Sequence, residues 1–343
     1  MAEPRPSSVR RAVVLGDGGW GTALALLLHK RGLDTTLWCN FRANVQEFTA
    51  TRENKRYLPG VRLPEGLKFT ADPHSAAKGV DFAVSAVPTQ FLRAVLERFE
   101  DALPGNVPIV SATKGLEIET LQRPSEILEA VLGERPTAVL SGPSHAEEVA
   151  AGKPASVVVA SHDEKLAQLT QDLFSSETFR VYTSRDPVGV ELGGALKNVI
   201  AIAAGISDGI ELGDNAKAAL ITRGMVEIAR VGLARGASKE TFFGLAGIGD
   251  LVATCCSKHS RNRSVGEQIG RGESLETILG RMKMVAEGVW TTKALFGPES
   301  EIAGVSMPIA AEVHAVLFER KDPRDAVSDL MRREPAPEMK GLV

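Results

Sequence analysis

The sequence has 343 residues, of which 43% are hydrophobic and 24% are charged, and its formal net charge at pH 7 is -3. This balance is typical of a soluble globular protein with two domains, and it excludes a chain that is disordered throughout. The small net charge provides no overall field that would hold nucleic acid or an anionic membrane, so neither is expected as a partner.

The first part of the chain alternates short β-branched runs with helical segments, which is the pattern of a parallel α/β sheet. Each run is apolar enough to be a strand that helices cover on both faces. The expected strands are residues 11–15, 35–39, 81–87, 108–112, 137–140, 155–160 and 179–183.

The first expected strand leads into the sequence GDGGWG at residues 16–21, and a helical segment follows it. In this context the GxGxxG pattern predicts a Rossmann-type dinucleotide-binding site. Gly16 would make the tight turn, Gly18 would let the backbone approach the pyrophosphate, and Gly21 would let the helix pack closely on the strand. The amides at the start of that helix would bind the anion.

The end of the second expected strand is where an NAD-binding domain carries an acidic residue for the ribose 2′-hydroxyl. Here the sequence runs through Asn40 and Arg42 without an acidic residue. An arginine at this place can accommodate the 2′-phosphate of NADPH, and a solvated surface arginine is the alternative. The sequence therefore leaves the coenzyme open between NADPH and NADH.

Two polar loops follow later strands at the carboxyl edge of the sheet, where open α/β sheets bind ligands. Residues 111–117 include Lys114, whose side chain could reach a bound substrate. Residues 141–146 are small enough to let the backbone approach a ligand closely. Ordinary surface turns are the alternative interpretation of both loops.

After residue 185 the strand-like runs stop, and nearly all of the remaining chain has the apolar periodicity of helices. The apolar pattern of residues 188–210 predicts a buried helix. Charged residues interrupt this segment, so it is a poor candidate for a membrane span. Lys197 lies in its middle. Burial would lower the pKa of this ammonium and a carboxylate such as Asp250 would raise it, so Lys197 suits proton transfer in both directions.

A second polar region of this helical half lies at residues 260–264, where Arg261 has serine and asparagine neighbours at a helix start. Such a cluster suits a phosphate, and a capped helix with a charged first turn is the alternative. We expect a Rossmann domain in residues 1–190 and an all-α domain, with substrate-binding and catalytic residues, in residues 191–343.

Several other classes of site are not indicated. The six histidines show no HExxH spacing, and no GxSxG pattern for a serine hydrolase occurs. Cys39, Cys255 and Cys256 form no CxxC pair, and we interpret all three as reduced, buried, apolar side chains. With no signal peptide or apolar run long enough for a bilayer, we expect a cytoplasmic protein without a metal.

From residue 11 to residue 333 the chain resembles the NAD(P)-dependent glycerol-3-phosphate dehydrogenases of the bacterial type. The segments that carry the resemblance are GDGGWGTALA at 16–25, YLPG at 57–60, TKGLE at 113–117, SGPSHAEE at 141–148, ELGGALKN at 191–198, GIGDL at 247–251, SRN at 260–262 and AEG at 286–288. The resemblance implies reversible reduction of dihydroxyacetone phosphate to sn-glycerol 3-phosphate, which supplies phospholipid synthesis. It also implies a C-terminal domain like that of 6-phosphogluconate dehydrogenase.

The resemblance also implies roles for individual residues, with Lys197 as the catalytic proton donor and acceptor. The implied substrate-binding residues are Lys114, Gly142, Ser144, Lys197, Asp250, Ser260, Arg261 and Asn262. The implied coenzyme-binding residues, together with those of the glycine-rich loop and the second strand, are Gly16, Gly18, Gly19, Trp20, Gly21, Asn40, Arg42, Lys114, Ala146, Arg261, Val285 and Glu287. A homodimer is compatible with the resemblance.

Two positions depart from the family pattern. Gly19 stands where the family usually has serine, and Asn40 stands where a basic residue is common. Two alternative functions remain open at this point. One is a related β-hydroxyacid or sugar-acid dehydrogenase, and the other is a non-catalytic regulator that binds NAD(H).

Overall fold

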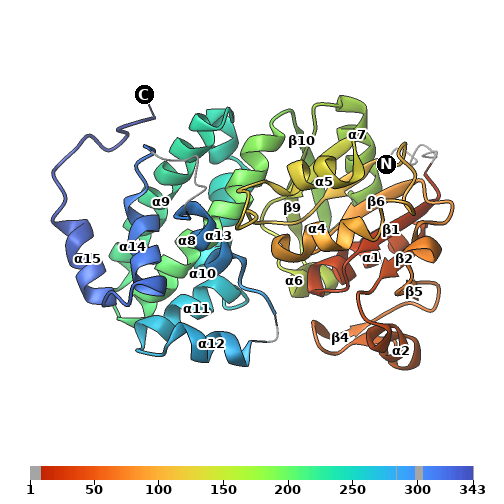
Figure 1. Ribbon diagram of the computed structural model, residues 1–343, viewed down its shortest axis with the longest axis horizontal. Helices are drawn as coiled ribbons and strands as arrows, with labels where there is room; N and C mark the ends of the chain where they lie inside the picture. The colour runs from red at the N-terminus through yellow and green to blue at the C-terminus, as the bar shows by residue number, and fades with distance from the viewer. Residues whose placement is uncertain (1–8, 283, 298–303, 343) are drawn as a thin grey trace. The chain divides into compact units, whose positions relative to one another are not determined.

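The computed structural model describes residues 9–282, 284–297 and 304–342, and its chain divides into two compact units (Figure 1). The first unit comprises the chain up to Thr113 together with Pro124–Pro187. The second unit comprises Lys114–Arg123 together with the chain from Val188 onward. The expected boundary at residue 190 leaves the short segment Lys114–Arg123 in the first domain, whereas the structure groups it with the second unit.

The first unit is built on an eight-stranded sheet with the order β10-β9-β8-β7-β6-β1-β2-β5. Its strands are β1 (Arg11–Leu15), β2 (Asp34–Trp38), β5 (Lys68–Thr70), β6 (Phe82–Ser85), β7 (Ile109–Ser111), β8 (Thr137–Ser141), β9 (Ala155–Ala160) and β10 (Phe179–Ser184). Strand β1 pairs in parallel with β2 on one side and with β6 on the other. The chain therefore reverses its direction of travel across the sheet at β1, which is where Rossmann folds bind dinucleotides.

Helices cover both faces of this sheet, as the apolar strands predicted. They are α1 (Gly19–Lys30), α2 (Arg42–Thr51), α3 (Pro73–Ala77), α4 (Thr89–Glu97), α5 (Pro124–Leu132), α6 (Ala146–Ala150) and α7 (Glu164–Phe174). Alternate residues of β1 enter different cores, with Val14 in one and Val13 and Leu15 in the other. The Rossmann architecture expected from the sequence is confirmed.

The sheet differs from the expected one in strand direction. Strand β9 runs antiparallel to β8, with Leu140 paired to Val159, so the predicted parallel sheet has one antiparallel pair that the sequence did not indicate. A parallel return needs a crossover of a dozen or more residues that usually carries a full helix. The connection here contains only the five-residue helix α6, which is too short to cross the sheet.

The short strands were not predicted. Strands β3 (Glu53–Asn54) and β4 (Leu58–Arg62) form a separate antiparallel pair, and β5 forms the edge of the main sheet. Strand β3 has only two residues, and β4 contains a Pro-Gly pair. Both features are unfavourable signals for a strand.

The second unit is helical, as expected. It contains α8 (Pro187–Gly209), α9 (Asp214–Ala234), the short turns η1 (Lys239–Phe243) and η2 (Leu245–Gly249), α10 (Asp250–Cys256), α11 (Arg261–Gly270), α12 (Leu275–Arg281), α13 (Glu287–Leu295), α14 (Pro308–Phe318) and α15 (Pro323–Met331). Helix α8 is long and apolar enough to cross a membrane by length and composition, but its apolar window is 100% buried. It is therefore the central helix of this unit's core.

Helices α8 and α11 pack backbone against backbone. A Cβ atom on Gly205 would collide with the carbonyl oxygen of Arg263, and one on Gly266 would collide with that of Ile202. Each helix thus needs glycine where the other helix approaches it. This contact fixes the start of α11 relative to the middle of α8.

The cysteines are free, but they are not all buried. Cys39 and Cys255 are buried and Cys256 is exposed, so the expectation of three buried thiols was wrong for Cys256. Successive residues of a helix point about 100° apart, and Cys256 is the last residue of α10, so it faces outward while Cys255 faces the core.

Candidate active site

The glycine-rich loop has the geometry that a dinucleotide requires. Gly16 has a φ of +105°, and a Cβ atom on Gly21 would collide with the Gly16 carbonyl oxygen. A Cβ atom on Gly18 would meet nothing within 4 Å, so this position is open. Helix α1 begins at Gly19 without a side-chain cap or an acidic residue in its first turn. Its N-terminal amides and open loop therefore fit a pyrophosphate.

The structure also explains why this loop has glycine where the family usually has serine. A Cβ atom on Gly19 would lie 2.6 Å from the carbonyl oxygen of Tyr57. That distance is shorter than any normal contact, so serine would require the backbone at Tyr57 to move. The neighbouring Trp20 is half-buried and packs its ring against Phe179 at a centroid distance of 6.4 Å.

The predicted coenzyme-specificity residues lie at the end of β2. Asn40 follows the strand and Arg42 begins α2, and both are exposed. Arg98 donates a hydrogen bond of 2.7 Å from Nη1 to the Asn40 amide oxygen, and its guanidinium lies 4.8 Å from the centre of the Trp38 ring. With its oxygen engaged, the Asn40 amide presents NH donors to a ligand. Sequence reasoning missed Arg98, since no local pattern joins residues so far apart in the chain.

The loop after β8 also shows a close backbone approach. Gly142 has a φ of +135°, and a Cβ atom there would lie 2.9 Å from the Val157 Cα atom. The Ser144 hydroxyl donates a hydrogen bond of 2.9 Å to the Gly142 carbonyl oxygen, and Ala146 begins α6. The loop therefore needs glycine at residue 142, and its conformation is supported by Ser144.

A buried charge network lies in the second unit. The Lys197 ammonium donates hydrogen bonds to Asp250 Oδ1 at 2.7 Å and to Thr254 Oγ1 at 2.6 Å. The other carboxylate oxygen of Asp250 accepts a bond of 2.8 Å from the Lys114 ammonium. The side chains of Lys197 and Asp250 are 7% and 3% exposed, so one buried carboxylate serves two ammonium groups.

The pKa values of this network follow from its burial and charges. The pKa of Lys197 is lowered to about 8, mainly by burial and also by the charge of Lys114, against the raising effect of Asp250. Burial opposes ionisation of Asp250, but the two ammonium groups prevail and keep its pKa below the usual value. A lysine with a pKa near 8 can both give and take a proton close to neutral pH.

Local structure brings Asp250 opposite Lys197. A Cβ atom on Gly193 of α8 would lie 2.5 Å from the Ala246 carbonyl oxygen, and one on Gly247 would collide with the backbone of Phe242. Gly193 thus lets the η2 turn lie directly against α8, and Gly247 lets it lie against η1. Asp250 then begins α10, and Thr254 follows one helical turn later on the same face.

Both ends of segment Lys114–Arg123 are held by ion pairs within the second unit. Lys114 pairs with Asp250 at one end, and Arg123 pairs with Glu191 of α8 at 2.6 Å at the other. The side chain of Glu191 is 1% exposed. Sequence reasoning included Lys114 but missed Arg123, Glu191 and Thr254; the i,i+4 spacing of Asp250 and Thr254 could have indicated the last.

The predicted phosphate-binding residues begin α11. Ser260 is the N-cap, and its hydroxyl accepts a hydrogen bond of 3.2 Å from the Arg263 amide. Arg261 is exposed and donates to the Val285 carbonyl oxygen at 2.9 Å, so two predicted coenzyme-binding residues lie together. Glu287, another predicted coenzyme-binding residue of the second unit, begins α13.

Asn262 has a structural role in the same unit. Its amide nitrogen donates to Asn198 Oδ1 and its amide oxygen accepts from the Gly288 amide, both at 2.9 Å. It therefore joins α11 to α8, next to Lys197, and to the start of α13. One hydrogen of its amide group remains for a ligand.

Residues 11–167 match the family model described as the N-terminus of NAD-dependent glycerol-3-phosphate dehydrogenase, and residues 186–328 match the model of its C-terminus. A glycerol-3-phosphate dehydrogenase (NAD(P)+) of Prosthecochloris aestuarii is 50% identical over 329 residues, covering 95% of this chain and 99% of that protein. One of Geobacillus thermodenitrificans is 50% identical over 333 residues, covering 96% and 97%. The crystal structure of glycerol-3-phosphate dehydrogenase from Coxiella burnetii has a TM-score of 0.91 and 38% identity, covering 95% of this chain and 99% of that chain.

Proposed function

Because the chain belongs to the NAD-dependent glycerol-3-phosphate dehydrogenase family, we propose that it interconverts dihydroxyacetone phosphate and sn-glycerol 3-phosphate with NADH or NADPH. The observation that carries this proposal is the buried hydrogen bond between Lys197 and Asp250. A buried lysine with a lowered pKa suits the proton transfer that a ketone reduction needs. The three relatives described above bear the name of glycerol-3-phosphate dehydrogenases, and none bears that of a hydroxyacid dehydrogenase or a regulator.

In this proposal Lys197 handles the proton of the reaction. The coenzyme, when bound, supplies hydride for reduction or accepts it in the reverse direction. As negative charge develops on the ketone oxygen, the Lys197 ammonium gives it a proton, and in the reverse direction the neutral amine takes the proton back. Asp250 and Thr254 hold the Lys197 Nζ atom in place through their hydrogen bonds.

The phosphate of the substrate is assigned to the start of α11. Ser260, Arg261 and Asn262 supply a hydroxyl, a guanidinium and an amide there, and the helix N-terminus favours an anion. Lys114 adds an ammonium beside Asp250. The family resemblance adds Gly142 and Ser144 to the proposed substrate-binding residues, and the Ser144 hydroxyl bonds the Gly142 carbonyl oxygen in that loop.

The dinucleotide is assigned to the first unit. Gly16, Gly18 and Gly21 form the open loop for its pyrophosphate, and Asn40 with Arg42 lies where its adenosine ribose would bind. Phe41 exposes 59% of its surface between them and offers a flat apolar face to a base. The remaining members of the proposed set are Gly19, Trp20, Lys114, Ala146, Arg261, Val285 and Glu287.

The test is oxidation of NADH or NADPH by the purified protein, followed by absorbance. Dihydroxyacetone phosphate should be reduced and sn-glycerol 3-phosphate formed. Arg261→Ala should lower kcat/KM for dihydroxyacetone phosphate by roughly tenfold or more while changing little with unphosphorylated dihydroxyacetone. Absence of turnover with dihydroxyacetone phosphate, alongside turnover of a hydroxyacid, would overturn the proposal.

The cell compartment and the oligomeric state are part of the same proposal. Cys39, Cys255 and Cys256 are all free, which supports a reducing compartment such as the cytoplasm. A cytoplasmic enzyme could supply glycerol 3-phosphate to phospholipid synthesis. We also propose a homodimer, which is compatible with the family resemblance and which the mass measured by sedimentation equilibrium would test.

A further inference from the structure

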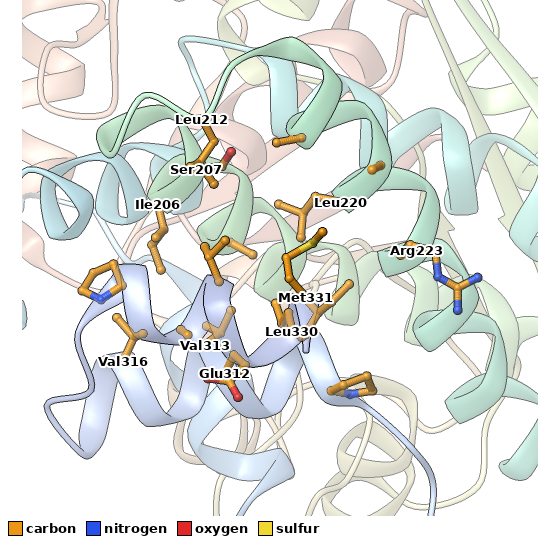
Figure 2. Close-up of a pocket in the computed structure, with 18 of the residues that line it drawn as sticks. Ile206, Ser207, Leu212, Leu220, Arg223, Glu312, Val313, Val316, Leu330 and Met331 are labelled. Carbon is orange, nitrogen blue, oxygen red and sulfur yellow. The ribbon is translucent and has the colours of Figure 1, made fainter. Parts of the chain in front are cut away.

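A cavity of about 300 Å³ lies in the helical unit between α8, α9, α14 and α15 (Figure 2). Its walls are mostly aliphatic, and they include Ile206, Leu220, Val313, Val316, Leu330 and Met331. A cavity of this volume is at the lower end of the range that binds small organic ligands. Met331 is 80% exposed at its edge, so the cavity is open to a ligand from outside.

The cavity is separate from the charge network. Helix α8 contributes Ala203, Ile206 and Ser207 to its wall, whereas Lys197 and its partners Asp250 and Lys114 do not line it. Nothing in the proposed reaction uses these walls. The cavity therefore needs an explanation of its own.

Polar groups in and around the cavity add two constraints. The Ser207 hydroxyl is buried, lines the cavity and has no hydrogen-bond partner among the residues that the structure describes. Arg223 and Arg333 also line the cavity, and Figure 2 shows the Arg223 guanidinium at the edge, directed outward. An anion at the edge would thus meet positive charge, while an apolar chain would fill the interior.

Two carboxylates, Glu227 and Glu312, also line the cavity, and Glu312 is engaged by Lys321 at 2.6 Å, so they offset the positive charge of the arginines only in part. Arg223 donates to the carbonyl oxygen of Glu338, and nearby Arg230 donates to the carbonyl oxygens of Lys340 and Ser306, which are neutral acceptors. Glu227, at the base, already accepts backbone hydrogen bonds from Ile309 and Ala310 at the start of α14.

We propose that this cavity binds a single-chain aliphatic carboxylate, with its chain among the side chains of α8, α9, α14 and α15 and its carboxylate on Arg223 and Arg333. The volume, at the lower end of the range for small ligands, suits one flexible aliphatic chain. A flat partner surface would leave the interior empty, whereas a flexible chain can fill it and leave its charged head at the edge.

The probe for the experiment is decanoate, used below its micelle concentration with the full-length protein and followed by calorimetry. We expect saturable binding of one decanoate per chain. Octanoate should bind more weakly, by up to about fourfold for each methylene removed. Decanol should bind more weakly than decanoate, and the double change Arg223→Gln with Arg333→Gln should abolish that difference.

Two matched variants test the position of the site. Ala216 lines the cavity and Ala218, on the same helix α9, does not. Ala216→Phe should weaken decanoate binding at least tenfold, and Ala218→Phe should leave it unchanged. Circular dichroism and the dehydrogenase assay check that both variants fold. If Ala216→Phe does not fold, Leu220→Trp serves as a second variant that fills the cavity.

Other results would overturn the proposal. Lack of saturable decanoate binding excludes this cavity as the site. Equal decanoate binding by the wild type, Ala216→Phe and Leu220→Trp excludes it as well. If decanoate does not bind and Ala216→Phe instead changes the sedimentation mass, the surface is an interface between copies of the chain. Because binding is measured directly, the result does not depend on whether the proposed reaction is correct.

Discussion

Burial and a neighbouring carboxylate have opposite effects on the pKa of the Lys197 amino group. Burial disfavours the ammonium, while Asp250 at 2.7 Å favours it, and the resulting pKa is about 8. Ketone reduction needs the protonated form and alcohol oxidation needs the neutral form. The reduction rate should therefore fall as pH rises through about 8, and the oxidation rate should rise over the same interval.

Lys197→Met tests this directly, because methionine keeps the length and apolar character of the side chain and removes its charge. We expect kcat to fall by about 10²–10⁴-fold, the usual contribution of a positioned general acid. Asp250 would keep its bond to Lys114, so the fold should survive. Steady-state kinetics measure the loss of kcat, and a fluorescence titration with coenzyme shows whether the folded variant still binds it. Near-normal turnover with an unchanged pH profile would assign the proton to another residue, with Lys114 the next to test.

Asp250→Asn should move the pH profile in a defined direction. Removing the carboxylate removes the charge that raises the pKa of Lys197, so the pKa should fall. The alkaline limb of ketone reduction should then move to lower pH, by roughly one unit or more, together with a lower kcat. Thr254→Val, which removes a hydrogen bond without changing charge, should move the limb less. A shift toward higher pH after Asp250→Asn would contradict the assignment.

Arg42 and Arg98 make a testable pair for coenzyme choice. Arg42 begins α2, and Arg98 holds the Asn40 amide oxygen from the end of α4. If they form the site for a 2′-phosphate, Arg42→Ala and Arg98→Ala should each raise KM for NADPH, by roughly tenfold for an exposed charged contact. KM for NADH should change little and serves as the internal control. Equal increases for both coenzymes would mean that the arginines do not distinguish them.

At the scale of elements, the glycines between α8 and α11 can be tested for their effect on stability. Gly266→Ala would force a methyl group against the Ile202 carbonyl oxygen, and we expect a loss of about 1–3 kcal/mol. A methyl group on Gly280 of α12 would meet nothing within 4 Å, so Gly280→Ala should instead stabilise by about 0.5–1 kcal/mol. Thermal unfolding midpoints measure both. Similar losses in the two variants would contradict close packing as the cause.

The elements that the sequence predicted well are those with strong periodicity. The main strands and the long helix α8 carry continuous apolar runs, so their positions follow from residues near in sequence. The direction of β9 depends on whether the chain after β8 forms a helix long enough to cross the sheet, and the composition of the strands does not contain that information. Strands β3 and β4 depend on pairing with each other, which their Pro-Gly pair and short length conceal.

The candidate site shows the same limit. The glycine loop, Lys197 and Asp250 were recognisable from local pattern or from family resemblance. The shared use of Asp250 by Lys114 and Lys197 is a contact between three separate segments, and only the folded chain shows it. The partners in the Arg123–Glu191 and Arg98–Asn40 pairs are also far apart in the sequence.

For the whole molecule, segment Lys114–Arg123 has a consequence for recombination between related proteins. The chain changes unit after Thr113, after Arg123 and after Pro187, so a single exchange near residue 190 separates parts of one unit. A chimaera made that way would combine Lys114 and Arg123 of one parent with Asp250 and Glu191 of the other. Each of these two ion pairs would then join a residue of one parent to a residue of the other.

Two chimaeras with the relative of Geobacillus thermodenitrificans would test this. Both take residues 188–343 from this chain, and they differ only in which parent supplies residues 114–123. The version that inherits this segment together with residues 188–343 should unfold at the higher temperature and retain more activity, because the packing around the two buried ion pairs then comes from a single parent. Equal behaviour of the two would show that the segment is interchangeable. In terms of inheritance, the segment belongs with the helices that follow it and not with the strands between which it is encoded.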